Sequence, residues 1–148
     1  MTRRKLFLAV FALLAAAPSA LAAPPEHGET AEGVPDEKEV ARSVELGGLV
    51  FPVFDEKGKL KNYLFVSARM LVAEGRDPWK YREKGHFIRD AVVRAAHKTS
   101  FNVKGDYTKL DEKLASAECL KVANAVVGEK DVLVSMTFTQ IASQSGLR

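Results

Sequence analysis

The sequence predicts an α+β domain, in which a small antiparallel sheet is covered on one face by two or three helices. Two strand-like segments joined by a polar turn come first, helical segments follow, and a third strand-like segment closes the pattern. In the second strand-like segment, residues 62–73, every even position from 64 to 72 is apolar: Leu64, Val66, Ala68, Met70 and Val72. Because side chains alternate across a strand, this pattern indicates one buried face and one mixed face. Such a sheet needs only one covering layer, which the later helices can supply.

The N-terminus has the features of an export signal over residues 1–22. Three basic residues at 3–5 precede an apolar stretch at 6–17, and Ala20-Leu21-Ala22 is a small-x-small cleavage site. We therefore expect cleavage before Ala23 and a periplasmic or secreted protein. The basic start also resembles a twin-arginine signal. The alternative is an inner-membrane anchor, since residues 6–23 are nearly long enough to span a bilayer.

The charge balance gives no indication of nucleic-acid binding. The chain has 22 basic and 19 acidic residues, but three of the basic ones belong to the predicted signal. Cleavage would leave equal numbers of each sign, so the basic isoelectric point describes the precursor. The only cysteine, Cys119, cannot form an internal disulfide, and stability must come from packing.

Residues 23–43 are predicted to form a flexible acidic tether, followed by the folded domain over residues 44–148. The segment holds three prolines, two glycines, six acidic and two basic residues, with almost no large apolar side chain. Such a composition buries too little apolar surface to offset the entropy of ordering. The domain has the opposite charge excess, so it could dock an acidic partner or the tether of a neighbouring copy.

Residues 44–54 are predicted to form the first strand, with Leu49, Phe51 and Val53 on one face. Gly47-Gly48 indicates a bulge or a close approach of the backbone, and Pro52 indicates a sheet edge, because proline cannot donate to a central ladder. The polar turn at residues 55–59 then makes a hairpin with the next strand.

The later elements are assigned from helical and strand spacing. Residues 86–98 fit one helix, with an Asp90–Arg94 pair on its surface. Residues 109–127 are also helical, but the apolar positions change stripe, which predicts a break with Ser116 as a helix cap. Residues 131–141 are predicted to form the last strand, with one apolar face of Val132, Val134, Met136 and Phe138.

Basic and aromatic residues are interleaved between the second strand and the first long helix. This candidate partner-binding cluster consists of Arg76, Trp79, Lys80, Tyr81, Arg82 and Lys84. A surface of this composition suits an acidic partner. The alternative interpretation is a loop or short helix whose aromatic residues pack against the edge of the sheet.

No pattern indicates a catalytic, cofactor or metal site, and we expect a protein that is not an enzyme and needs no cofactor. His27, His86 and His97 lack the spacing of metal ligands. Cys119 lies on an apolar stripe, where a free cysteine is typically a small buried hydrophobe rather than a nucleophile.

Several segments resemble the periplasmic domain of FliL, the flagellar basal-body-associated protein. They are residues 44–53 (VELGGLVFPV), 63–68 (YLFVSA), 88–92 (IRDAV) with 98–99 (KT), and 130–140 (KDVLVSMTFTQ). Their order and spacing carry the resemblance, which covers most of the chain after residue 43. It implies a stomatin-like fold, a scaffolding role beside the flagellar stator, and domains that can assemble side by side.

The sequence thus favours a non-enzymatic periplasmic interaction protein resembling FliL, with a role in flagellum-dependent motility or another envelope complex. Its expected partner is a protein of the envelope, a stator or basal-body component if the resemblance holds, or a second copy in a homo-oligomer. The alternative is a binding module for a small ligand or cell-envelope component. A small hydrolase is the third hypothesis.

Overall fold

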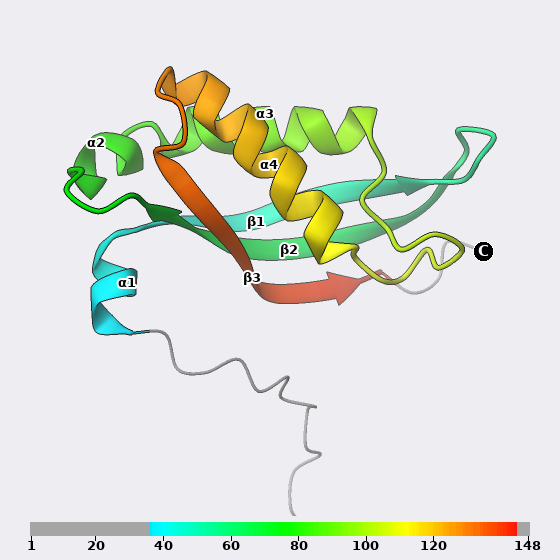
Figure 1. Ribbon diagram of the computed structural model, residues 1–148. Helices are drawn as coiled ribbons and strands as arrows, with labels where there is room; N and C mark the ends of the chain where they lie inside the picture. Colours follow the sequence, from blue (N-terminus) through cyan, green and yellow to red (C-terminus); the bar gives the residue numbers. More distant parts are fainter. Residues whose placement is uncertain (1–35, 145–148) are drawn as a thin grey trace, which may run out of the picture. The chain divides into compact units, whose positions relative to one another are not determined.

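The computed structural model describes residues 36–144, which form a three-stranded antiparallel sheet and four helices. The elements follow the order α1 (Glu37–Ala41), β1 (Ser43–Phe54), β2 (Leu60–Val72), α2 (Pro78–Arg82), α3 (Gly85–Lys98), α4 (Glu112–Val127) and β3 (Leu133–Ser143). β2 lies between β1 and β3, and the two long helices α3 and α4 cover one face of the sheet (Figure 1). The predicted fold class is confirmed.

The alternation predicted for β2 is confirmed, because all five of its even apolar positions from 64 to 72 are buried. Against them pack β1 residues Leu49, Phe51 and Val53, which are at most 1% exposed. The other face of β2 is mixed, with Phe65 43% exposed. The two long helices α3 and α4 both lie on the opposite face of the sheet (Figure 1).

β1 has both predicted irregularities. Leu46 lies opposite Ala68 and Leu49 lies opposite Val66, so Gly47 and Gly48 form a bulge. Gly48 has a φ of 63°, a conformation that favours glycine. Pro52 lies on an edge strand, as expected, because β1 has only β2 as a neighbour.

Helix α3 agrees with the prediction, with Ile88, Ala91, Val92 and Ala96 buried against the sheet. The predicted surface pair between Asp90 and Arg94 is present.

The predicted break near Ser116 is wrong, because α4 is continuous. Its N-cap is Asp111, whose carboxylate accepts a hydrogen bond from the Leu114 amide at 3.0 Å. The buried stripe has a spacing of four and consists of Ala115, Cys119, Ala123 and Val127. The sequence pattern misled because two of the four buried residues are alanine and one is cysteine, whereas the larger Leu114 and Val126 are each 39% exposed.

The last strand also differs from the prediction. β3 begins at Leu133 and runs to Ser143, and a register shift lies between the Val72–Leu133 and Leu71–Ser135 pairs. Val134 is therefore an extra residue in the ladder and is 50% exposed. The expected apolar face is correct for Val132, Met136 and Phe138 but wrong for Val134, because a bulge changes which face a side chain takes.

The end of the predicted tether is regular structure. Helix α1, capped by Asp36, occupies residues 37–41, and β1 begins at Ser43. The folded domain therefore starts before residue 44. The predicted signal at residues 1–22 and the rest of the tether, residues 23–35, lie outside the described residues. Within residues 36–144 no helix has the length and apolar character needed to cross a membrane.

Candidate interaction surface

The predicted partner-binding cluster is centred on α2, a single turn that is held by its neighbours. Asp77 caps the helix by accepting the Trp79 amide at 3.0 Å, and Pro78 occupies the first helical position. Proline has the right φ there and loses no hydrogen bond. The cap fixes the direction in which the following side chains point.

Three residues of the cluster converge on Glu129, in the turn between α4 and β3. The Tyr81 hydroxyl donates to Glu129 Oε2 at 3.0 Å, and Arg76 Nη1 lies 3.4 Å from the same oxygen. Lys80 donates to the other carboxylate oxygen. Hydrogen bonds from Lys80 and Tyr81 lower the pKa of Glu129, and the bond to Glu129 raises the pKa of Lys80. Both ionic partners therefore stay charged over a wide pH range.

The remaining two basic residues bind backbone carbonyls. Arg82 Nε donates to Ser43 O at 2.8 Å and its Nη2 to Ala41 O at 2.7 Å, which fastens α2 to the start of β1. Lys84 Nζ donates to Val127 O at 3.1 Å, at the negative end of α4. These cations stabilise the domain as well as charging its surface.

One member of the predicted cluster is not on the surface. Tyr81 is 1% exposed, and burial raises the pKa of its hydroxyl. The expectation that Tyr81 contacts a partner is therefore wrong: its ring packs in the core, as the alternative interpretation held, and its hydroxyl is used by Glu129.

Trp79 is the member of the cluster most open to a partner. It is 67% exposed, the largest value among the exposed large apolar residues of the described chain. The Arg82 guanidinium carbon lies 5.0 Å from the centre of its ring, within range of a cation–π interaction. The indole is thus presented on a short helix that is fixed on several sides.

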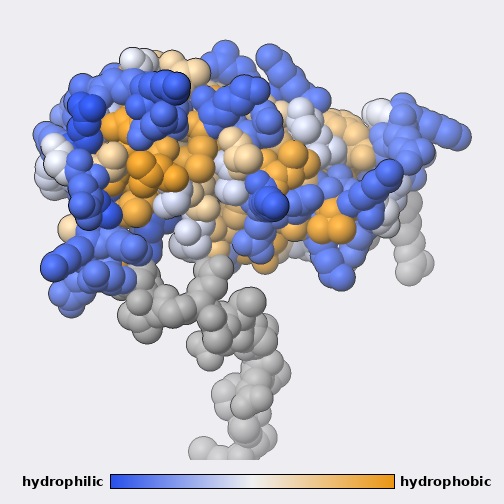
Figure 2. All heavy atoms as spheres, in the orientation of Figure 1, coloured by the Kyte–Doolittle hydropathy of each residue, from blue (hydrophilic) through white to orange (hydrophobic). Residues whose placement is uncertain are grey.

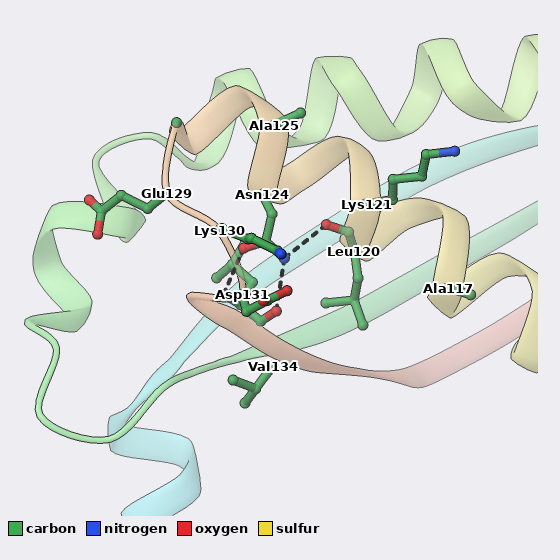
Figure 3. A pocket seen from close by; sticks show the side chains of 11 residues that line it. Ala117, Leu120, Lys121, Asn124, Ala125, Glu129, Lys130, Asp131 and Val134 are labelled. Atoms are coloured by element: carbon green, nitrogen blue, oxygen red, sulfur yellow. Dashed lines mark hydrogen bonds between the residues drawn. The ribbon is translucent and has the colours of Figure 1, made fainter.

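A groove of about 690 Å³ lies between α4 and the start of β3. Leu120, Leu133 and Val134 line it with apolar side chains, and Lys121, Glu129, Lys130 and Asp131 line it with charged ones. Figure 3 shows Leu120 on α4 and Val134 on β3. In Figure 2 apolar side chains reach the surface on the face of the molecule that carries these elements, with hydrophilic residues around them.

Asn124 joins the two walls of this groove. Its Oδ1 accepts the amides of Val132 and Leu133 at 3.1 and 2.9 Å, and its Nδ2 donates to Leu133 O at 2.9 Å and to Leu120 O at 3.1 Å (Figure 3). All four hydrogen-bonding positions of the amide are occupied. Asn124 is therefore a structural link and has no free group to offer a ligand.

Cys119 is buried, as predicted, and burial raises the pKa of its thiol to about 12. The thiolate needed for nucleophilic attack is therefore scarce at neutral pH. No group of three or more metal-ligating side chains occurs among the described residues. His86 stacks on Phe87, His97 Nδ1 lies 2.8 Å from Val93 O, and His27 is outside the described residues.

Comparisons with protein-family models, with curated proteins and with solved structures found no match to this chain. The fold and the surface defined above describe an α+β domain with an exposed tryptophan and an open groove.

Sequence reasoning missed both the groove and the role of Asn124. The available signal was the polar residue itself, which interrupts the apolar stretch from Val122 to Val127. The presence of this asparagine does not reveal what its side chain binds. The two amides and the Leu133 carbonyl that it binds lie at the start of β3, beyond the turn that follows α4.

Proposed function

We propose that this chain is a non-enzymatic interaction or scaffolding protein of the bacterial cell envelope, of the FliL type. It is exported by its N-terminal signal and binds a protein partner, which is a component of the flagellar stator, the basal body or another envelope complex. The proposed family and the proposed role in motility are supported by the segments that resemble FliL, which occur in the same order and spacing. One structural observation supports action through surface contacts: the exposed indole of Trp79 on a capped helix.

An exposed tryptophan is a strong anchor for a partner protein. Burying it removes a large apolar area from water, and tryptophan and arginine are enriched among the residues that dominate binding energy. Trp79 is 67% exposed and stacks beside Arg82 on a capped helix. The capped helix holds the backbone of Trp79 in place, so less of the chain has to be ordered on binding, which favours affinity.

The test replaces Trp79 by alanine in the full chain, tagged at its C-terminus and expressed in the source bacterium. Proteins retained from envelope extracts are identified, and the affinity of the purified partner is then measured. Loss of a central tryptophan contact should weaken binding at least about tenfold. Reversing the charge of Arg82 is a poorer test, because it would also break the bonds to Ala41 and Ser43.

The matched control is Tyr107→Ala. Tyr107 is 37% exposed and lies in the loop between α3 and α4, at the end of the sheet away from α2 (Figure 1). Binding should be unchanged in this variant, and both variants should melt near the wild-type temperature. Equal binding by the Trp79 variant and the wild type would refute the proposed contact.

The second candidate function is the binding of a small ligand or envelope component in the groove between α4 and β3. Its volume of about 690 Å³ is within the range of small-molecule sites. Against this function, Asn124 has no free hydrogen-bonding group to offer a ligand. An Ala125→Phe variant, which fills the groove from α4, should abolish the thermal stabilisation produced by such a ligand if this function is correct.

A further inference from the structure

The two edges of the sheet differ in how they are protected. Along β1 the Gly47-Gly48 bulge and Pro52 interrupt the edge. Side chains also bind its backbone: Arg89 Nη2 donates to Gly48 O at 2.8 Å, and Ser100 Oγ accepts the Phe54 amide at 3.2 Å. Bulges, proline and covering groups are the usual means of preventing another strand from pairing with an edge.

β3 forms the other edge and lacks most of these means. Its eleven residues include no charged residue, proline or glycine. Figure 1 shows β3 at the margin of the sheet, and no further strand pairs with it within residues 36–144. Within β3, the Asn124 side chain binds the backbone N–H and C=O of Leu133 alone. Two register shifts bracket a regular segment, Ser135–Phe138.

Known hydrogen bonds establish which backbone groups of β3 face outward. The Ala73 amide donates to Val132 O at 2.8 Å, and the Gln144 amide donates to Tyr63 O at 3.0 Å. Successive residues of a strand direct their N–H and C=O groups to opposite sides. The odd-numbered residues of β2 therefore direct their backbone N–H and C=O groups toward β3 along the whole of β2.

The same alternation defines the free edge. Ser135 and Thr137 lie opposite odd-numbered residues of β2, so their backbone groups are directed toward β2. Met136 and Phe138, in alternation with them, direct their N–H and C=O groups away from the sheet. Their side chains lie in the core, at 8% and 5% exposure. A regular, uncharged edge with outward hydrogen-bonding groups is suited to strand addition.

We propose that two copies of this chain pair antiparallel through the free edges of β3, about a two-fold axis at Thr137. In this register Met136 of each copy lies opposite Phe138 of the other. The backbone N–H and C=O groups of these two residues form hydrogen bonds between the copies. The two sheets become one six-stranded sheet. The contact is isologous, as the interfaces of two-fold dimers are.

The residues of β3 favour a second copy over an unrelated strand, because the sequence is nearly palindromic about Thr137. Met136 would lie opposite Phe138, so apolar meets apolar, and the two Thr137 hydroxyls would meet on the axis. Threonine pairs and apolar pairs stabilise neighbouring strands, and like charges opposite each other destabilise them. β3 carries no charge that would repel its own copy or attract a charged partner.

Cysteine cross-linking tests this register in the full chain after export. Two Thr137 residues on the axis form a non-hydrogen-bonded pair with Cα atoms about 4.5 Å apart, a distance compatible with a disulfide. Thr137→Cys should therefore become a covalent dimer on mild oxidation. Ser135→Cys is the matched control, because its two copies are four residues apart along the strand, about 13 Å. Cys119 is buried and should not contribute.

Sedimentation equilibrium supplies an independent measurement. The wild type should sediment as a dimer, and Thr137→Lys, which places two like charges together on the axis, should raise the dimer dissociation constant at least tenfold. Gln140→Lys adds the same charge to the same strand but away from the axis, and should remain dimeric. A monomeric wild type, equal cross-linking of both cysteine variants, or an unaffected Thr137→Lys dimer would each overturn the proposal. None of these variants alters Trp79, so the two interaction tests are independent.

Discussion

Replacing Asn124 by alanine removes the side chain that links α4 to the start of β3. Three of its hydrogen bonds reach the strand, to the amides of Val132 and Leu133 and to the carbonyl of Leu133. The fourth reaches Leu120 O within the same helix. The substitution therefore leaves three strand groups without their protein partner, at a half-buried position.

The expected cost follows from these bonds. Each contributes about 1 kcal/mol net to stability, and alanine recovers about 0.6 kcal/mol through its better helix propensity. The free energy of unfolding should therefore fall by about 2–2.5 kcal/mol. For a domain near 100 residues this lowers the melting temperature by roughly 10 °C.

Urea unfolding monitored by circular dichroism measures this loss, and hydrogen exchange localises it. The amides of Val132 and Leu133 should lose protection while those in the centre of β2 keep it. Lys121→Ala is the control, since Lys121 is an exposed neighbour on α4 and its removal should cost at most about 0.5 kcal/mol. A loss below 0.5 kcal/mol for Asn124→Ala, or unchanged protection of both amides, would refute the linking role.

Three further predictions concern the thiol, the ionic network around Glu129 and the N-terminus. Cys119→Ala should cost about 1 kcal/mol or somewhat more through the cavity it leaves, and native Cys119 should react with a thiol reagent only as fast as the domain unfolds. The lowered pKa of Glu129 contributes stability that is complete above about pH 4.3, the unfolded glutamate value, and is lost as pH falls through the folded pKa. Melting temperatures should therefore fall more steeply below that pH for the wild type than for Glu129→Gln, and parallel curves would contradict this. N-terminal sequencing of the exported protein should begin at Ala23, whereas an intact Met1 or Thr2 in a membrane fraction would indicate an anchor.

Much of the fold could be predicted because the elements carry strong local patterns. In β2 the alternation of large apolar and mixed positions is continuous, so Leu64 and Met70 could be assigned to the core directly. Gly47-Gly48 pointed to a bulge or a close backbone approach, since glycine inside a strand pattern marks either, and the pairing with β2 shows the bulge. Helix α3 has an equally clear apolar stripe.

Predictions failed where the pattern was weak or where a partner distant in sequence decides the conformation. In α4 the buried stripe is built from small residues such as Ala115 and Ala123, so larger exposed side chains dominated the signal. Val134 was assigned to the core by alternation, but its exposure follows from a bulge that only pairing with β2 creates. Of the candidate cluster, the sequence found the residues but not their contacts with Glu129.

The sequence by itself determined the fold class, the central strand and the irregularity at Gly47-Gly48 in β1. It also showed that the chain after the predicted signal has equal numbers of basic and acidic residues, which gives no indication of nucleic-acid binding. These depend on local periodicity and composition, which a chain carries in every conformation. The tertiary structure alone decided that Tyr81 is buried, that Trp79 is exposed, and that Asn124 joins α4 to the start of β3. It also decided that β3 ends the sheet with outward hydrogen-bonding groups. The physical reason is that exposure and hydrogen-bond partners are properties of pairs of segments, and the members of each pair are far apart in the sequence or separated by a turn.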